Sequence, residues 1–254
     1  METWCMDKYN ALLSSIETHD AASINDLFEN GIDPNERFNG VPLFSIMVEM
    51  YFRSPHFKDC IRVFRNHGLR FDDPGLLAVL SDDAAELTLL LKEDPNIIHK
   101  RYTYFNNTFT SLAGGTLLHY CAEYNHLACG EVLIKSGADV NSRAEVDHCG
   151  FGGHTPIFHT VAQHNNNSVN MMQLLIDNGA DVLYTVRGLI WGKGYEWETF
   201  VPAVNALSYA AMGLLPQMHR DPKQIAGNIS KMLAYTFGIS YELPNIPNKY
   251  LQKQ

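Results

Sequence analysis

Short apolar segments with helical spacing recur along the chain, and several of them end in the same way. In VLIKSGADVN (132–141) and QLLIDNGADVL (173–183), an apolar helix end is followed by Gly-Ala-Asp-Val. Weaker copies of this ending are DLFENGIDPN (26–35), VFRNHGLRFD (63–72), LLLKEDPNII (89–98) and KMLAYTFGIS (231–240). A pattern that returns at intervals of a few tens of residues predicts a repeat architecture.

The segments that open each unit also share a pattern. GTLLHYCAE (115–123) and HTPIFHTVA (154–162) both place a threonine before a run of apolar residues. GVPLFSIMV (40–48) and VNALSYAAM (204–212) are similar. Between each opening and each ending lie two segments with apolar residues at helical spacing. Each unit is therefore predicted to be a pair of short antiparallel helices.

These openings and endings together resemble the ankyrin repeat, whose signature is T-P-L-H-x-A-A followed by L-L-x-x-G-A-D-x-N. Residues 113–181 carry two clear copies, and residues 9–73 carry two degenerate ones. Residues 74–98 and 204–240 fit as further members of the same array. The long segments between units are also similar to those of a group of bacterial ankyrin proteins with lengthened loops.

The resemblance implies an all-α ankyrin-repeat solenoid of about six helix pairs, with β-hairpin or long-loop insertions on one edge. We expect residues 1–254 to form a single domain. Its approximate repeats are 8–40, 41–73, 74–112, 113–153, 154–203 and 204–240, followed by a C-terminal tail at 241–254.

Most polar residues of the repeats have a structural explanation. Thr116 and Thr155 precede predicted helices, where a hydroxyl can accept hydrogen bonds from free backbone N–H groups. By its resemblance to the family pattern, His119 is expected to bond the threonine and the neighbouring loop. Gly137 follows a helix end, where glycine suits a left-handed conformation. Asp94 stands at the same position in its unit and suits that conformation less well, so we expect a distortion there.

Three long loops are the candidate functional surface: residues 99–115, 142–153 and 183–204. The third predicts a β-hairpin that turns at Gly192-Lys193-Gly194. Because the loops lie at consecutive unit junctions, we expect them to stand side by side. Their aromatic residues either pack on one another or contact a partner. The partner-binding candidates are Tyr102, Tyr104, Phe105, Phe109, Asp147, His148, Phe151, Trp191, Tyr195, Trp197 and Phe200.

Composition narrows the class of partner. The formal net charge of −9 argues against nucleic acid, whose binding depends on clustered Lys and Arg, and is compatible with a basic protein partner. No apolar run approaches the roughly 18 residues of a membrane-spanning helix. The N-terminal segment lacks a signal-peptide pattern, and the five cysteines show no C-x-x-C pairing. We therefore expect a cytoplasmic protein with reduced thiols and no membrane partner.

Three chemical alternatives can be formulated from the sequence. Asp147, His148, Cys149 and His154 lie within eight residues and are possible zinc ligands, but their spacing matches no standard pair. Cys149 or Cys121 with a histidine would suggest a thiol nucleophile, although Cys121 is expected to be buried between helices and nothing marks an oxyanion hole or an orienting acid. The glycines of GFGG (150–153) lack the flanking residues of a phosphate loop. We expect no enzyme activity, no cofactor, no metal and no small-molecule substrate.

The expected function is recognition of a protein through the loop edge and the concave face. A narrower hypothesis is an inhibitor or immunity-type protein that blocks a cognate toxin or enzyme. Both follow by analogy from the fold.

Overall fold

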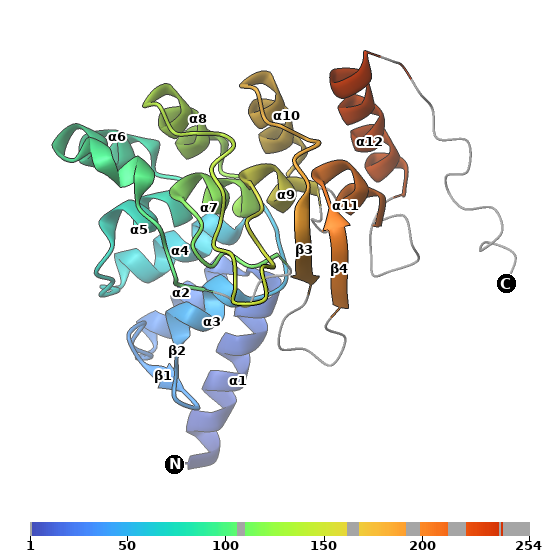
Figure 1. The fold of residues 1–254 in the computed structure, drawn as a ribbon. Coiled ribbons are helices and arrows are strands. Elements are labelled where there is room, and N and C mark those ends of the chain that lie inside the picture. The colour runs from blue at the N-terminus through green and yellow to red at the C-terminus, as the bar shows by residue number, and fades with distance from the viewer. Residues whose placement is uncertain are drawn as a thin grey trace, which may run out of the picture.

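The computed structural model describes residues 2–105, 110–161, 168–191, 199–212, 222–238 and 240, and in them a first and a second helix alternate (Figure 1). The first helices are α1 (Glu2–Thr18), α3 (Leu43–Glu49), α5 (Pro74–Leu80), α7 (Leu117–Tyr124), α9 (Pro156–Val161) and α11 (Ala206–Met212). The second helices are α2 (Ala21–Glu29), α4 (Phe57–Asn66), α6 (Ala84–Glu93), α8 (Leu127–Lys135), α10 (Val169–Asp177) and α12 (Pro222–Phe237).

The helices pack in two rows. In the first row α7 lies between α5 and α9, and α9 in turn contacts α11. In the second row α8 lies between α6 and α10 (Figure 1). These helices thus pack on the equivalent helices of the neighbouring units, as in a solenoid. The predicted helical solenoid is confirmed.

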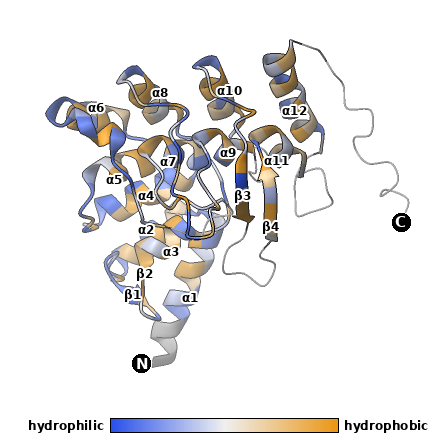
Figure 2. Ribbon diagram, in the orientation of Figure 1, coloured by the Kyte–Doolittle hydropathy of each residue, from blue (hydrophilic) through white to orange (hydrophobic). Residues whose placement is uncertain are grey.

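The core is continuous along the stack. Buried apolar residues form one cluster that extends from Leu12 in α1 to Met232 in α12. Figure 2 shows hydrophobic residues along the helices, where the rows meet. A pair of helices of 7 to 10 residues, such as α5 and α6, cannot enclose an apolar core alone, so each unit depends on its neighbours for burial.

Two short antiparallel ladders interrupt the helices. In the first, β1 (Arg37–Phe38) pairs with β2 (Val41–Pro42). In the second, β3 (Val186–Trp191) pairs with β4 (Thr199–Val204), with Gly188 opposite Pro202. The two strands expected in 183–204 are therefore present, and the turn expected at 192–194 lies outside the described residues.

The helix ends follow the sequence expectation at the glycines. Gly137 and Gly179 adopt φ values of 92° and 88°, which favour glycine. Asp94 differs, because its φ of −136° is extended and its side chain accepts a hydrogen bond from the Asn96 amide. The chain then continues into the 3₁₀ helix η1 (Pro95–His99). The expected distortion of this unit is found, and it takes the form of an added helical turn.

Asparagine side chains connect successive units on the side of the helix ends. Asn141 donates from Nδ2 to the Gly179 carbonyl at 3.0 Å and accepts from the Asp181 amide at 2.8 Å. Asn35 makes the equivalent pair of bonds with the next unit, at 3.0 and 2.7 Å. These bonds set the spacing between adjacent turns.

A second set of links lies on the opposite edge, at the turns within the helix pairs. Asp82 and Asn125 adopt left-handed φ values of 51° and 56°. Their side-chain oxygens accept from the amides of Cys129 and Met171, each at 3.2 Å. These amides lie in the first turns of α8 and α10, so each turn caps the second helix of the following unit.

We predict that Asn141→Ala lowers the free energy of unfolding by about 1 to 2 kcal/mol, because two inter-unit hydrogen bonds are lost and their backbone partners remain. Urea unfolding followed by circular dichroism measures the change. Asn170→Ala, at an exposed position in the first turn of α10, is the control and is expected to stay within about 0.5 kcal/mol of wild type. Equal effects of the two substitutions would contradict the role of Asn141.

Candidate functional site: the loop edge

The described parts of the three long loops form one surface, which we call the loop edge. The first loop pairs its own ends, with Tyr102 opposite Gly115. The second loop joins the first, because the Glu145 amide donates to the Ala113 carbonyl at 3.1 Å. It also joins the third, because the Gly152 amide donates to a carbonyl in β3 at 2.9 Å. The prediction that the loops stand side by side is confirmed.

Glycines permit this close lateral approach. A Cβ atom at Gly114 would lie 2.4 Å from the Cβ of Glu145, and one at Gly152 would lie 2.3 Å from the Glu145 carbonyl oxygen. Both distances are shorter than any real contact of this kind, and both glycines have positive φ. The glycines of the GFGG segment therefore allow the second loop to pack closely between its neighbours.

Two of the candidate aromatic residues lie in the core. Tyr102 is 1% exposed and its ring meets that of Tyr120 at 5.8 Å. Phe105 is 7% exposed and packs near Phe44 and Phe71. Buried side chains cannot contact a partner, so the prediction of a binding role for Tyr102 and Phe105 is corrected: they support the first loop.

Other candidates are accessible. Tyr104 and Phe200 are each 46% exposed, and His148 is exposed. Phe151 and Asp147 are half-buried. Of the remaining candidates, Phe109, Tyr195, Trp197 and the side chain of Trp191 lie outside the described residues.

The structure also exposes an apolar residue of the second loop that the sequence analysis missed. Val146 is 53% exposed, although its backbone pairs with Gly152. Val146 lies in an insertion that has no repeat pattern. The only sequence signal for a binding role was therefore an apolar residue among polar neighbours. Phe151 packs against Phe200, with ring centroids 4.6 Å apart, and joins the second loop to the third.

A cavity of about 250 Å³ opens where the three loops meet. The first loop contributes Thr110 and Ser111, whereas β3 contributes Leu189 and Ile190. The second loop contributes most of the wall. Among the described residues, the lining is Thr110, Ser111, Ala113, Glu145, Asp147, Phe151, Gly152, His154, Leu189 and Ile190.

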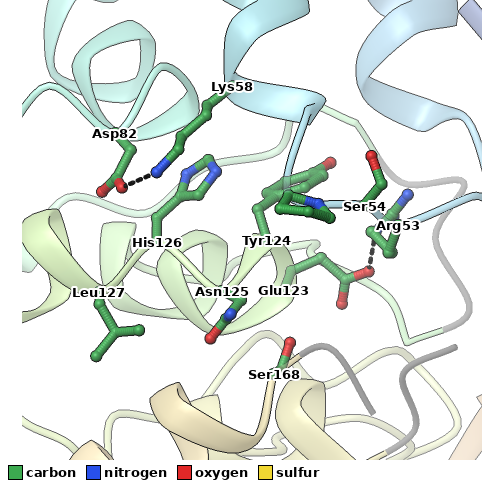
Figure 3. Close-up of a pocket in the computed structure, with 11 residues that line it drawn as sticks. Arg53, Ser54, Lys58, Asp82, Glu123, Tyr124, Asn125, His126, Leu127 and Ser168 are labelled. Carbon is green, nitrogen blue, oxygen red and sulfur yellow. Dashed lines mark hydrogen bonds and ion pairs between the residues drawn. The ribbon is translucent and has the colours of Figure 1, made fainter. Parts of the chain in front are cut away.

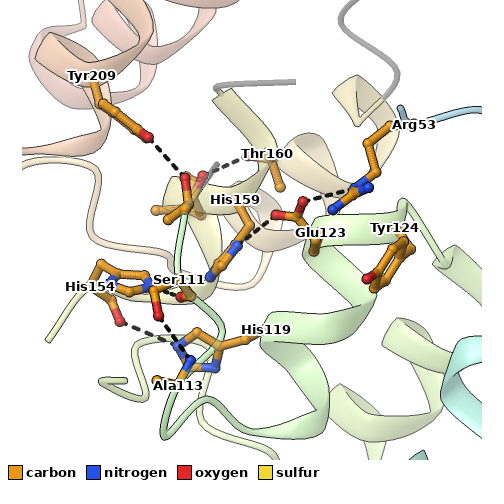
Figure 4. A network of polar contacts seen from close by, with 12 residues as sticks. Arg53, Ser111, Ala113, His119, Glu123, Tyr124, His154, His159, Thr160 and Tyr209 are labelled. Carbon is orange, nitrogen blue, oxygen red and sulfur yellow. Dashed lines mark hydrogen bonds and ion pairs between the residues drawn. The ribbon is translucent and has the colours of Figure 1, made fainter. Parts of the chain in front are cut away.

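Behind the loops lies a buried polar network (Figure 4). Glu123 in α7 accepts from Arg53 Nε at 2.9 Å and from His159 Nδ1 at 2.8 Å. Burial opposes ionisation of Glu123, but the charge of Arg53 and the bond from His159 outweigh it and hold the pKa below its ordinary value. All three side chains are almost fully buried, so the network connects units rather than presenting a reactive group.

His119 performs the expected clamping role. Its Nδ1 accepts from the Thr116 amide at 3.0 Å, and its Nε2 lies 3.3 Å from the His154 carbonyl (Figure 4). The equivalent interaction is missing in the following unit, where Phe158 occupies the histidine position. The Thr155 hydroxyl is accordingly buried without a hydrogen-bond partner among the described residues, and its predicted capping role is not found.

The residues proposed as metal ligands are used in other ways. Asp147 Oδ1 accepts from the Cys149 and Phe151 amides, at 2.8 and 2.9 Å. His154 lies 2.8 Å through Nε2 from the Ser111 carbonyl. Within the described ranges, no three His, Cys, Asp or Glu side chains are grouped to hold a metal ion.

The buried cysteines are poorly suited to nucleophilic chemistry. Burial raises the pKa of Cys60 to about 12 and raises that of Cys121 well above its ordinary value. A nucleophilic cysteine needs its thiolate form. The structure therefore gives no support to the thiol hypothesis at Cys121, whereas the other candidate, Cys149, is exposed.

A second cavity of about 250 Å³ lies on the opposite edge, at the turns between paired helices (Figure 3). Lys58 pairs with Asp82 at 2.9 Å, and Arg53 pairs with Glu123 at the same distance. The positive and negative charges of this cavity are thus balanced within the wall.

Comparison with known proteins agrees with this geometry. Residues 76–186 match the family model of ankyrin repeats (3 copies). A search of curated proteins gave no match. With the stacked helix pairs already described, the match shows that residues 76–186 are ankyrin repeats. Ankyrin repeats are generally modules for protein–protein interaction.

None of the helices in the described ranges has the length and hydropathy needed to cross a membrane.

We predict that acid destabilises the protein. Burial lowers the pKa of His126 to about 4 and of His154 to about 3, so both are neutral when folded. The unfolded chain, with histidine pKa values near 6.5, binds protons that the folded chain does not. Stability therefore falls as the pH drops below about 6.5, by about 2 kcal/mol for each such histidine between pH 7 and pH 5.

Urea unfolding at the two pH values tests this. His126→Asn is expected to show a smaller loss between pH 7 and pH 5 than wild type, by about 2 kcal/mol. His148→Asn, at an exposed position, is expected to retain the wild-type loss. Stability that is unchanged or higher at pH 5 would show that the buried histidines are not neutral.

We also predict that His119→Ala lowers the free energy of unfolding by about 2 to 3 kcal/mol, because it leaves the Thr116 amide buried without its acceptor and opens a void. Thermal and urea unfolding measure the loss. His148→Ala is the surface control, with an expected change within about 0.5 kcal/mol. An unchanged melting temperature in His119→Ala would exclude the clamp.

Proposed function

We propose that this protein binds a partner protein through the loop edge and the adjoining concave face, without catalysing a reaction. The observation that carries the proposal is the arrangement of the three loops. They are joined by backbone hydrogen bonds, they surround one cavity, and they expose Tyr104, Val146 and Phe200. Exposed apolar and aromatic side chains on a rigid surface are the usual anchors of protein interfaces.

The electrostatics of the edge favour a basic partner surface. Glu145 is exposed, and Asp147 is half-buried in the wall of the cavity. The whole chain carries a formal charge of −9, which speeds encounter with a positively charged protein. We propose that the array of six units over residues 8–240 acts as one rigid support for this edge.

The inhibitor hypothesis is a narrower form of the same proposal. An enzyme bound at the edge would lose activity in proportion to the amount of this protein added, up to one equivalent. If the enzyme keeps its activity in the saturated complex, the protein recognises its partner without inhibiting it.

We predict that Val146→Asp and Tyr104→Ala each weaken partner binding at least about tenfold, because each removes an exposed apolar contact from the edge. Leu89→Asp is the matched control, since Leu89 is 60% exposed on α6, away from the loops. Capture from host lysate with the wild-type protein and the control identifies the partner, and titration calorimetry then measures the dissociation constants.

Circular dichroism of each variant verifies that the helices are intact. A partner that binds the two edge variants as tightly as wild type, and is lost with Leu89→Asp, would place the interface elsewhere.

A further inference from the structure

Three histidine side chains form a cluster behind the loop edge (Figure 4). They are His119 in α7, His154 directly after the second loop, and His159 in α9. The ring centroids of His119 and His154 lie 6.1 Å apart, those of His119 and His159 5.7 Å, and those of His154 and His159 5.0 Å. None is more than 2% exposed. A positive charge on one of these buried rings therefore opposes a charge on the others.

The histidine cluster holds the bases of the first and second loops. His154 Nε2 lies 2.8 Å from the Ser111 carbonyl of the first loop, and the His154 carbonyl accepts from the Ala144 amide of the second loop at 2.8 Å. His119 joins the same groups. Its Nδ1 accepts from the Thr116 amide, directly after the first loop, and its Nε2 reaches the His154 carbonyl. The attachment of both loops to the helices thus depends on these rings.

The contacts of His119 require its neutral form. The Thr116 amide can only donate, so Nδ1 must be without a proton and Nε2 must carry it. A second proton, on Nδ1, would set one N–H against another. The Thr116 hydroxyl, also 3.0 Å from Nδ1, can accept that proton, but the buried amide then loses its acceptor. Burial, with the neighbouring His159 and His154, accordingly holds the pKa of His119 well below its ordinary value.

Charged groups of neighbouring elements also face the cluster. Glu123 in α7 accepts from His159 Nδ1 at 2.8 Å, and Arg53, which follows α3, pairs with the same carboxylate. After burial and the two histidines, the charge of Arg101 in the first loop is a further cause of the lowered pKa of His119. Glu123 thus compensates Arg53 and His159, whereas His119 bonds mainly to backbone groups.

We propose that the histidine cluster is a pH-sensitive latch, which holds the first and second loops on the helices at neutral pH and releases them in acid. Once released, His119 meets water and, with an ordinary pKa near 6.5, takes up a proton below that pH. The closed latch does not bind this proton, so a falling pH favours release. Released loops are no longer a preorganised surface, and partner binding weakens. The inference rests on the proposed function in that it regulates that same surface.

Amide hydrogen exchange of the full chain at pH 7 and pH 5.5 tests the latch. The Thr116 and Ala144 amides report its opening, because both donate to groups of the cluster. After correction for the intrinsic exchange rate at each pH, their opening constants are expected to rise at least about eightfold at pH 5.5, the effect of one histidine with an open-state pKa near 6.5.

The Arg70 amide, which donates to Asn35 away from the cluster, is the internal control and is expected to rise less. An equal rise at Arg70 would show that the whole fold opens, and it would overturn the latch. Opening constants at Thr116 and Ala144 that do not change with pH would overturn it as well.

A single substitution separates the proton from the contact. Glutamine at the third helical position accepts from the amide of the residue before the helix, so His119→Gln is expected to keep the bond to Thr116 without titrating. Its rise in the opening constants is expected to be about eightfold smaller than that of wild type. His148→Gln, exposed in the second loop, is the matched control and is expected to show the wild-type rise.

Circular dichroism verifies that both variants fold, and the wild-type exchange at the two pH values tests the latch without them. An undiminished rise in a folded His119→Gln variant would overturn the latch.

The outcome separates the latch from the proposed function, because exchange is measured without a partner. A latch that opens in acid, together with a partner unaffected by the edge variants, would support the latch and refute edge-mediated recognition. Constant protection of Thr116 and Ala144, together with a partner that depends on Val146, would support recognition and refute the latch.

Discussion

The structure depends on lateral pairing between units that cannot fold alone. Helices such as α5 and α9, of 7 and 6 residues, are too short to be stable in isolation. Their apolar faces are buried only when a neighbouring unit packs against them at the right distance. Asn35 and Asn141 set that distance on one side of the stack. Asp82 and Asn125 set it at the opposite edge, so the spacing is determined at both ends of the helices.

The loop edge follows from the same spacing. Because adjacent units are held at a constant distance, their insertions emerge side by side and can share backbone hydrogen bonds, as Glu145 does with Ala113. The loops then need glycine wherever one backbone crosses another, and Gly114 and Gly152 occupy those positions. A surface held in this way loses little conformational entropy on binding, which favours rigid recognition of a partner.

The sequence predicted the repeated part well and the insertions less well, for a physical reason. In the repeats, Gly137 and Gly179 meet nearly the same environment in successive units, so a local pattern determines their role. In an insertion, burial depends on the neighbouring insertion, which no local pattern describes. Tyr102 and Tyr104 are two residues apart in an alternating segment, yet one is buried and the other exposed. Val146 was missed for the same reason.

The two kinds of acidic residue illustrate how position decides function. Glu123 lies between Arg53 and His159, so its negative charge is compensated inside the array. Replacement of either partner would leave the buried carboxylate poorly compensated. Glu145 has a similar carboxylate but is exposed on the loop edge. The first stabilises the contact between units, whereas the second lies at the surface of the loop edge. An acidic surface of this kind can therefore select its partner without any change in the scaffold beneath it.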